Sequence, residues 1–411
     1  MKRIDFYFDF SCPYAYLGAT QIEALAARVG AELCLKPMLL GGVFKAHDVP
    51  QNLASTLSPA KAKHNASEMQ RWATRFEVPL VMPKGHPMRT VDALRAMLAV
   101  GAPYHDLMHR FYRAYWVESR DVSSPEVIAD VLTAAGHDAA AVMAKAGSQA
   151  IKDELRARTD EAIQVGVFGA PTSVVDGELY WGQDRLGEVE RACGGSLVAP
   201  AFSSERDAPL HPIDFYFDYS SPFSCLGAAR VDGLLGVGER VTWRPMLLGA
   251  VFKAVQMANV PLFSLSPAKR KYVAADLKRQ AIQADFAFKW PSRFPMNTVL
   301  SLRVTHAAGV ATTAEGRALI ARIYRAYWSE DQDISDPEVV ARLCDDVGLD
   351  GAALVARATE PEIKQALRDS TSHAVEAGVF GAPTTVVHTP EGSELFWGND
   401  RLEEALRVAT K

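Results

Sequence analysis

The stretch Gly166-Val167-Phe168-Gly169-Ala170-Pro171-Thr172 returns, residue for residue, as Gly378 to Thr384. A proline has no N–H to give to a strand ladder, so it belongs at the start or the edge of a strand. The repeated turn therefore predicts that a strand begins beside it in each place.

Other segments return in the same order along the chain. The offset between the copies drifts only from 208 residues (Leu57 to Leu265) to 216 residues (Trp181 to Trp397). A period of this length is a whole domain rather than a solenoid unit, so the chain is a tandem duplication of one domain of about 200 residues. The repeated pairs are Ile4–Asp9 with Ile213–Asp218, Pro37–Gly41 with Pro245–Gly249, Leu57–Lys61 with Leu265–Lys269, and Tyr112–Trp116 with Tyr324–Trp328.

The composition excludes several classes of protein. At 411 residues, with 48% hydrophobic and 23% charged residues, the chain resembles a folded globular protein. A formal net charge of -5 argues against a nucleic-acid partner. No apolar run approaches the length of about 18 residues that a membrane helix needs, so we expect no membrane partner.

Cysteine usage bears on the compartment. The five cysteines include no C-x-x-C pair, which is typical of a reducing environment. The strand pattern begins directly after Met1 and leaves no room for a signal peptide. We therefore expect a cytoplasmic protein. The cysteines are Cys12, Cys34, Cys193, Cys225 and Cys344.

The pattern within the first copy predicts β-α-β, a large helical insertion, and β-β-α. Alternating apolar and charged residues predict the strands, and prolines at first helical turns support the helix starts. The predicted elements are a strand at 2–10, a helix at 14–29, a strand at 32–39, helices within 42–163, strands at 171–175 and 178–181, and a helix from 184.

The second copy repeats this plan. We expect an α/β protein with two domains, 1–196 and 212–411, joined by a Gly-, Ser- and Pro-containing linker at 197–211. The helical insertion of the second domain is expected at about 250–375.

One residue precedes a helix-opening proline in each copy: Cys12 before Pro13, and Ser221 before Pro222. A side chain at this position meets unpaired backbone N–H groups and the positive end of the helix dipole, which stabilise an anion. A thiol there is expected to have a lowered pKa, so Cys12 should be the most reactive of the five cysteines. The alternative for Ser221 is an ordinary N-cap.

A second constellation is Trp-Gly-(Gln/Asn)-Asp-Arg, at 181–185 and at 397–401. It places Asp184 and Asp400 at predicted helix starts. An aspartate at that position usually caps the helix. It could equally bind an ammonium group while the neighbouring N–H groups bind a carboxylate.

These motifs, with Asp-Phe/Tyr-x-x-Pro at the start of each copy, resemble those of a DsbA-like thioredoxin-fold family. This family comprises 2-hydroxychromene-2-carboxylate isomerases and kappa-class glutathione transferases. The resemblance covers both halves. It implies two tandem thioredoxin-like (DsbA-like) domains, each with a large helical insertion, and a glutathione cofactor.

The resemblance also implies roles for particular residues. Ser221, and by position Cys12, would meet the glutathione sulfur. The residues before two prolines expected to be cis would pair with the tripeptide backbone, and the Asn/Gln-Asp pairs would hold its γ-glutamyl end. The implied glutathione-binding residues are Asn259, Lys271, Ala382, Pro383, Asn399 and Asp400 in the second copy, and Lys63, Ala170, Pro171, Gln183 and Asp184 in the first.

The first copy departs from this pattern. Cys12 replaces the usual serine, Asp48 replaces Asn259, His64 replaces Tyr272 and Arg89 replaces Asn297. An aspartate near a thiolate would oppose it electrostatically, although a nearby arginine could offset that effect. The second copy is therefore the better candidate for a glutathione site.

The resemblance implies glutathione-dependent isomerisation of an aromatic-derived, 2-hydroxychromene-2-carboxylate-like substrate, with a role in the catabolism of aromatic compounds. The cofactor thiolate would be the nucleophile. Two enzymatic alternatives remain open: kappa-like glutathione transfer, and thiol–disulfide exchange at Cys12 resolved by glutathione. A non-catalytic glutathione-binding protein is the third alternative.

Two further patterns have simpler interpretations. His105 and His109 stand four residues apart, as in some metal sites, but no third ligand of matching spacing appears, so we expect a helix surface and no metal. The Tyr-Arg-Ala-Tyr-Trp segments have aromatics at helical spacing, which usually marks a core face. Since relatives commonly form homodimers, the fused halves are expected to form an internal pseudo-dimer.

Overall fold

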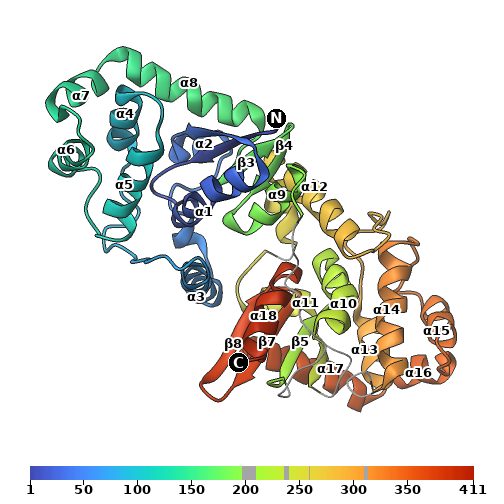
Figure 1. Cartoon of the computed structure of the whole chain (residues 1–411). Helices are drawn as coiled ribbons and strands as arrows, with labels where there is room; N and C mark the ends of the chain where they lie inside the picture. Colours follow the sequence, from blue (N-terminus) through green and yellow to red (C-terminus); the bar gives the residue numbers. More distant parts are fainter. Residues whose placement is uncertain (197–209, 236–239, 259, 310–312) are drawn as a thin grey trace. The chain divides into compact units, whose positions relative to one another are not determined.

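The computed structural model describes residues 1–196, 210–235, 240–258, 260–309 and 313–411. Asn259 and most of the expected linker lie outside these residues, so the expected domain boundaries stay a prediction. The chain forms two compact units (Figure 1). The first consists of Met1–Leu57, Asn65–Pro200 and Ser266–Tyr272, and the second of Ser58–His64, Ala201–Leu265 and Val273–Lys411. Each unit thus contains a short segment that the sequence places in the other repeat.

The first unit is built on a four-stranded mixed sheet of order β2-β1-β3-β4. β1 pairs parallel with β2 and antiparallel with β3, and β3 forms a hairpin with β4. The elements around it are β1 (Arg3–Phe8), α1 (Pro13–Val29), β2 (Glu32–Pro37), β3 (Thr172–Val175), β4 (Glu178–Trp181), a 3-10 turn η2 (Gln183–Arg185) and α9 (Leu186–Ala192).

Helices cover both faces of this sheet. The Phe6 ring lies 3.4 Å from the position that a Cβ on Gly18 of α1 would occupy. The neighbouring Tyr7 donates from its hydroxyl to Glu161 at 3.3 Å on α8 (Gln149–Val165). Because successive strand residues point to opposite faces, α1 and α8 lie on opposite sides of the sheet.

The helical insertion separates β2 from β3. In Figure 1 helices α4 to α7 gather together beside the sheet, and α8 leads back to it. Before α8, the insertion consists of α2 (Leu40–Ala46), η1 (Leu53–Thr56), α3 (Pro59–Arg75), α4 (Val91–Val100), α5 (His105–Trp116), α6 (Pro125–Ala134) and α7 (Ala139–Ala146).

The second unit repeats this architecture with a sheet of order β6-β5-β7-β8. Phe215 packs toward Gly227 of α10, whereas the next residue, Tyr216, contacts His373 of α17 at 2.8 Å. The strands of this sheet and the helices next to them in the chain are β5 (Ile213–Phe217), α10 (Pro222–Leu235), β6 (Val241–Pro245), β7 (Thr384–Thr389), β8 (Gly392–Trp397), η4 (Asn399–Arg401) and α18 (Leu402–Ala409).

The second insertion has the same order of helices as the first. Its members are α11 (Leu248–Ala254), η3 (Pro261–Ser264), α12 (Pro267–Gln283), α13 (Val299–Ala307), α14 (Ala314–Trp328), α15 (Pro337–Asp345), α16 (Gly351–Arg357) and α17 (Pro361–Glu376).

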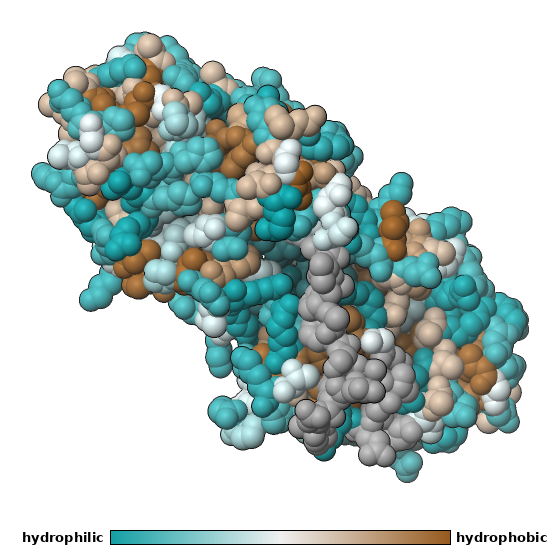
Figure 2. All heavy atoms as spheres, viewed as in Figure 1, coloured by the Kyte–Doolittle hydropathy of each residue, from teal (hydrophilic) through white to brown (hydrophobic). Residues whose placement is uncertain are grey.

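The α/β fold predicted from the sequence, a thioredoxin-like sheet twice with a helical insertion each time, is confirmed. Most of the surface visible in Figure 2 is hydrophilic, with hydrophobic residues scattered over it. Among the described residues, no helix combines the length and apolar character that crossing a bilayer requires.

Candidate glutathione site

Ser221 ends the turn between β5 and α10 and is buried. Its hydroxyl donates to the carbonyl oxygen of Ala382 at 2.9 Å and accepts the N–H of Ser224 at 3.1 Å. The second bond is that of an N-cap, because it satisfies one of the orphan N–H groups of the helix. The capping interpretation of Ser221 is therefore correct, and the first bond joins the same hydroxyl to the turn before Pro383.

Cys12 holds the equivalent place at the start of α1. Its thiol donates to the carbonyl oxygen of Ala170 at 3.0 Å, and it makes no side-chain cap to the helix. The peptide bonds Ala170–Pro171 and Ala382–Pro383 are both cis, as expected. The two copies thus share one arrangement, with a thiol in the first and a hydroxyl in the second.

Burial opposes the lowered pKa that the sequence predicts for Cys12. Burial raises the pKa of the Cys12 thiol to about 12, although the N–H groups of Ala15 and Tyr14 lower it and the carboxylate of Asp9 raises it further. The thiol is only 8% exposed. The helix N-terminus does stabilise the thiolate, but the loss of solvation outweighs it, and the sequence could not show how deeply the thiol is buried.

A buried aspartate organises the loop before each of these residues, and the sequence analysis assigned it no role. Asp218 accepts the N–H of Ser220 at 2.9 Å, the N–H of Leu248 at 2.8 Å and the hydroxyl of Thr298 at 2.8 Å. Burial raises its pKa, while these donors oppose the shift. The carboxylate joins the end of β5 to the starts of α11 and α13, so Asp218 positions the loop that carries Ser221.

Asp9 does the same in the first unit. It accepts the N–H of Ser11 at 3.0 Å, the N–H of Leu40 at 2.7 Å and the hydroxyl of Thr90 at 2.7 Å. The recurrence of an acid with the same kinds of partner in both copies was the signal in the sequence that could have identified it.

The tyrosines, alanines and tryptophans of the Tyr-Arg-Ala-Tyr-Trp segments are buried, as expected for core residues, whereas the arginines are exposed. The segments also bond the loops that carry Ser221 and Cys12. Trp328 donates from its indole N–H to the carbonyl of Tyr219 at 2.8 Å, and the Tyr324 hydroxyl donates to the carbonyl of Asp218 at 3.2 Å. In the first unit, Trp116 and Tyr112 bond the carbonyls of Phe10 and Asp9 at 2.8 and 3.3 Å. The tyrosine and the tryptophan, four residues apart on one face of the helix, thus donate to two successive backbone carbonyls of each loop.

The Trp-Gly turn docks on the cis-proline turn in both units. The N–H of Gly398 donates to the carbonyl of Pro383 at 3.0 Å, and that of Gly182 to Pro171 at 2.9 Å. Gly398 has φ 116°, and a Cβ there would lie 2.6 Å from a carboxylate oxygen of Asp400. Only glycine allows this backbone to pass so close to the aspartate.

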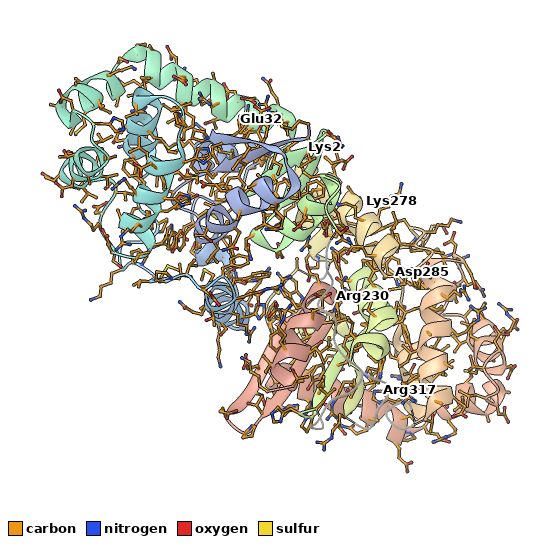
Figure 3. The ribbon with its side chains drawn as sticks, in the orientation of Figure 1. Lys2, Glu32, Arg230, Lys278, Asp285 and Arg317 are labelled. Atoms are coloured by element: carbon orange, nitrogen blue, oxygen red, sulfur yellow. The ribbon has the colours of Figure 1, made fainter. Side chains whose placement is uncertain are left out.

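The Asn399-Asp400 pair and its counterpart Gln183-Asp184 differ in their surroundings. Asn399 is buried and donates to Gln280 at 2.6 Å, and Gln280 in turn donates to Asp276 at 2.5 Å. Arg230 of α10, labelled in Figure 3, bonds the carbonyl of Asn399 at 3.4 Å. In the first unit, Gln183 is also buried, but the positions of Gln280 and Asp276 hold Trp72 and Glu68.

The two aspartates keep the same local ion pair. Asp400 lies 3.1 Å from Arg401, and Asp184 lies 3.1 Å from Arg185. The carboxyl side chain of Asp400 is 26% exposed and that of Asp184 is 15% exposed. The structure therefore brings together Ser221, Ala382–Pro383 and Asn399–Asp400 in the second unit, and their counterparts in the first.

The structure places Lys63 and Lys271 differently from the sequence analysis. Both side chains are exposed, and the segment with Lys271 belongs to the first compact unit, whereas the segment with Lys63 belongs to the second. Lys271 is thus grouped with Cys12 rather than with Ser221.

Another lysine of each segment meets the tryptophan of the Trp-Gly turn. In the first unit Lys269 lies 4.6 Å above the ring of Trp181, and the Tyr272 hydroxyl accepts the N–H of Trp181 at 3.2 Å. In the second unit Lys61 lies 5.0 Å above Trp397, and burial lowers its pKa. These contacts depend on the fold and could not be assigned from spacing.

His105 and His109 share one acceptor. Both imidazoles contact the same carboxylate oxygen of Glu23, at 2.8 and 2.9 Å, and all three side chains are partly exposed. The part of the chain that the structure describes contains no group of three side chains suited to hold a metal ion. The pair therefore links α5 to α1.

The profile of the DSBA-like thioredoxin domain family matches residues 3–194 and again residues 212–408. The 2-hydroxychromene-2-carboxylate isomerase of Sphingobium xenophagum is 30% identical over 198 residues, which cover 46% of this chain and 96% of that protein. The chain belongs to the DSBA-like thioredoxin domain family.

The isomerase and kappa branch of the DSBA-like family contains further relatives. The rat (Rattus norvegicus) protein named glutathione S-transferase kappa 1 is 26% identical, over 48% of this chain and 94% of its own length. A solved 2-hydroxychromene-2-carboxylate isomerase structure matches with 28% identity and a TM-score of 0.44, covering 47% of this chain and 94% of that one. The named relatives are enzymes, and each spans one half of this chain.

Proposed function

We propose that the second unit is a glutathione-dependent isomerase that acts on a 2-hydroxychromene-2-carboxylate-like substrate. The observation that carries the proposal is the contact of Ser221 with Ala382 at the start of α10. It places a hydroxyl proton, a helix N-terminus and a strand-edge peptide together. The identity to the Sphingobium xenophagum isomerase supports the reaction class.

The residues present fit glutathione. A peptide lying along the turn would give an N–H to the carbonyl of Ala382, which now accepts the Ser221 hydroxyl. That exchange would release the hydroxyl proton for the sulfur. At the γ-glutamyl end of the tripeptide, the partly exposed carboxylate of Asp400 suits the α-ammonium group. Gly398 leaves room for this carboxylate, since a Cβ there would collide with it.

The chain's own groups would then act as follows. The helix N-terminus and the Ser221 hydroxyl stabilise negative charge on the sulfur, against an ordinary thiol pKa of about 8.5. Bound glutathione supplies a nucleophilic thiolate for reversible addition to a conjugated carbon, which permits ring opening and bond rotation. Asp218, Trp328 and Thr298 hold the loop so that the hydroxyl does not have to reorganise during the reaction.

Thiol chemistry at Cys12 receives less support than isomerisation at Ser221. The thiol is buried with a raised pKa, so little thiolate is present near neutral pH. We infer that the first unit has a mainly structural role or a weaker glutathione site. The five free cysteines agree with a cytoplasmic location, which we also propose.

Steady-state assays test the proposal. Purified protein with glutathione is offered a chromene-2-carboxylate, a chloro-aromatic electrophile and a mixed disulfide. We expect turnover of the chromene, with loss in Ser221→Ala and retention in Cys12→Ser. Turnover of the chloro-aromatic alone would identify a kappa-like transferase instead.

A further inference from the structure

A cluster of aromatic side chains surrounds Trp328 in the second unit. Phe288 stacks on Trp328 with ring centroids 5.6 Å apart, and Trp290 and Phe294 lie at 5.8 and 6.0 Å. Phe263 of η3 extends the cluster by an edge contact with Phe294 at 6.1 Å. We call these five side chains the aromatic platform.

The platform is attached to the loop that carries Ser221. Trp328 bonds the carbonyl of Tyr219, two residues before Ser221, at 2.8 Å. The segment with Trp290 is tied to Trp328 by a bond from the N–H of Lys289 to the Trp328 carbonyl at 2.7 Å, and it ends at Thr298, which bonds Asp218. A ring held on the platform would therefore keep a fixed position relative to the catalytic loop.

Part of the platform faces solvent. Trp328 is fully buried, but Trp290 is 41% and Phe263 is 56% exposed. Both exposed rings contact Phe294, at 5.0 and 6.1 Å, and a cluster of exposed aromatics is a surface whose burial by a ligand would be favourable. Aromatic faces and edges bind a flat ring better than a flexible chain, because offset stacking and edge contacts need a planar partner.

The first unit has the same backbone hydrogen bond with fewer rings around it, since only the imidazole of His86 packs on Trp116, with centroids 5.1 Å apart. Val81, the counterpart of Lys289, donates its N–H to the carbonyl of Trp116 at 2.8 Å. The positions of Phe263, Phe288, Trp290 and Phe294 are occupied there by Ser55, Leu80, Met82 and His86. Val81, Met82 and Met88 line a cavity of about 580 Å³ at this place in the first unit.

 The first unit therefore offers Leu80, Met82 and a single imidazole ring where the second offers three large aromatic rings.

We propose that Trp290 and Phe263 are specificity-determining residues that hold the planar ring of the substrate in the second unit, and that the first unit does not select for a planar ring. This inference rests on the proposed function for its reaction, but the ring-binding surface itself does not. A planar aromatic ring is the ligand group that the platform fits.

Equilibrium binding tests the platform without turnover. The probe is 1-naphthoate, added to full-length protein with glutathione present, and quenching of tryptophan fluorescence is recorded. The variants are Trp290→Met and Phe263→Ser, which install the residues of the first unit. The control is Ile282→Ser, because Ile282 is a 73% exposed apolar residue of the same unit that makes no ring contact with the platform.

We expect Trp290→Met to weaken 1-naphthoate binding by roughly three- to tenfold, the size of an aromatic pair contribution. Phe263→Ser should weaken it less, and sorbate, an open-chain conjugated acid, should bind all proteins equally. Equal 1-naphthoate affinity in wild type and Trp290→Met would overturn the proposal. So would a loss of self-association in Trp290→Met with unchanged 1-naphthoate affinity, since the patch would then cover a second copy.

Kinetics separate this inference from the proposed function. If the chromene is turned over, Trp290→Met should raise KM for it with little change in kcat, and Ile282→Ser should change neither. If no chromene is turned over while 1-naphthoate binding still depends on Trp290, the isomerase assignment fails and the platform stands.

Discussion

The Ser221 hydroxyl lies 2.9 Å from the carbonyl oxygen of Ala382, so the residue before Pro222 is bonded to the residue before Pro383. These two residues are 161 positions apart in the chain. Their contact joins the first turn of α10 to the turn before β7. It defines the position at which the proposed cofactor sulfur would be held.

Ser221→Ala should reduce kcat/KM by roughly ten- to a hundredfold, because a hydrogen bond to a charged group contributes about 1.5–3 kcal/mol. The same change removes the N-cap of α10 and should cost about 1 kcal/mol of stability. Steady-state kinetics and urea unfolding measure the two effects. Ser221→Thr is the control, since it keeps a hydroxyl, and equal loss in both variants would indicate a packing role only.

Cys12 should react slowly with iodoacetamide near neutral pH. Its folded-state pKa of about 12 lies above the ordinary thiol value, so the thiol stays protonated well above neutral pH. Mass spectrometry of limited labelling should show Cys34, which is only partly buried, modified before Cys12.

The raised pKa of Cys12 also makes the unfolding free energy depend on pH. The folded thiol keeps its proton to higher pH than the unfolded thiol. The stability that the protonated Cys12 contributes to the unfolding free energy is therefore fully present below about pH 8 and is lost as the pH rises above about 9. Cys12→Ala should therefore flatten the fall in unfolding free energy between pH 8 and pH 10. Rapid labelling of Cys12 at pH 7 would show that the thiol is solvated and ionised.

Asp218→Asn should destabilise the second unit by about 1–3 kcal/mol, because an amide group cannot accept all the donors that now converge on the carboxylate. Chemical denaturation measures the change, and Asp9→Asn is the matched variant in the first unit. If isomerisation occurs at Ser221, only Asp218→Asn should also lower kcat. An equal loss of kcat in both variants would mean that both units contribute to turnover.

Residues 1–196 expressed alone should self-associate or precipitate. The first compact unit contains the segment Ser266–Tyr272, whose tyrosine packs on Phe168 and Trp181 and is missing from such a fragment. Its loss would expose these apolar rings. Size-exclusion chromatography tests this, and a stable monomeric fragment would show that the segment is dispensable.

Much of the fold could be predicted because the duplication acts as an internal alignment. The strand at Thr172, the helix after Pro13 and the hairpin before Trp181 follow from local residue patterns. The burial of Cys12 could not be predicted, because it depends on how the rest of the unit covers the thiol.

The same limit applies to contacts between distant segments. The bonds from Trp328 to Tyr219 and from Trp181 to Tyr272 join parts of the chain whose proximity no local pattern shows. The repeat showed that Trp328 and Tyr219 each belong to a duplicated region, but it did not show what they bond.

Titration of glutathione into Asp400→Asn by calorimetry tests the central claim most directly. The claim predicts a roughly ten- to hundredfold weaker affinity than wild type, through loss of a charge-assisted contact. The matched variant Asp184→Asn, in the first unit, should change the affinity of that site little. An unchanged affinity in Asp400→Asn would contradict the assignment of the glutathione site to the second unit.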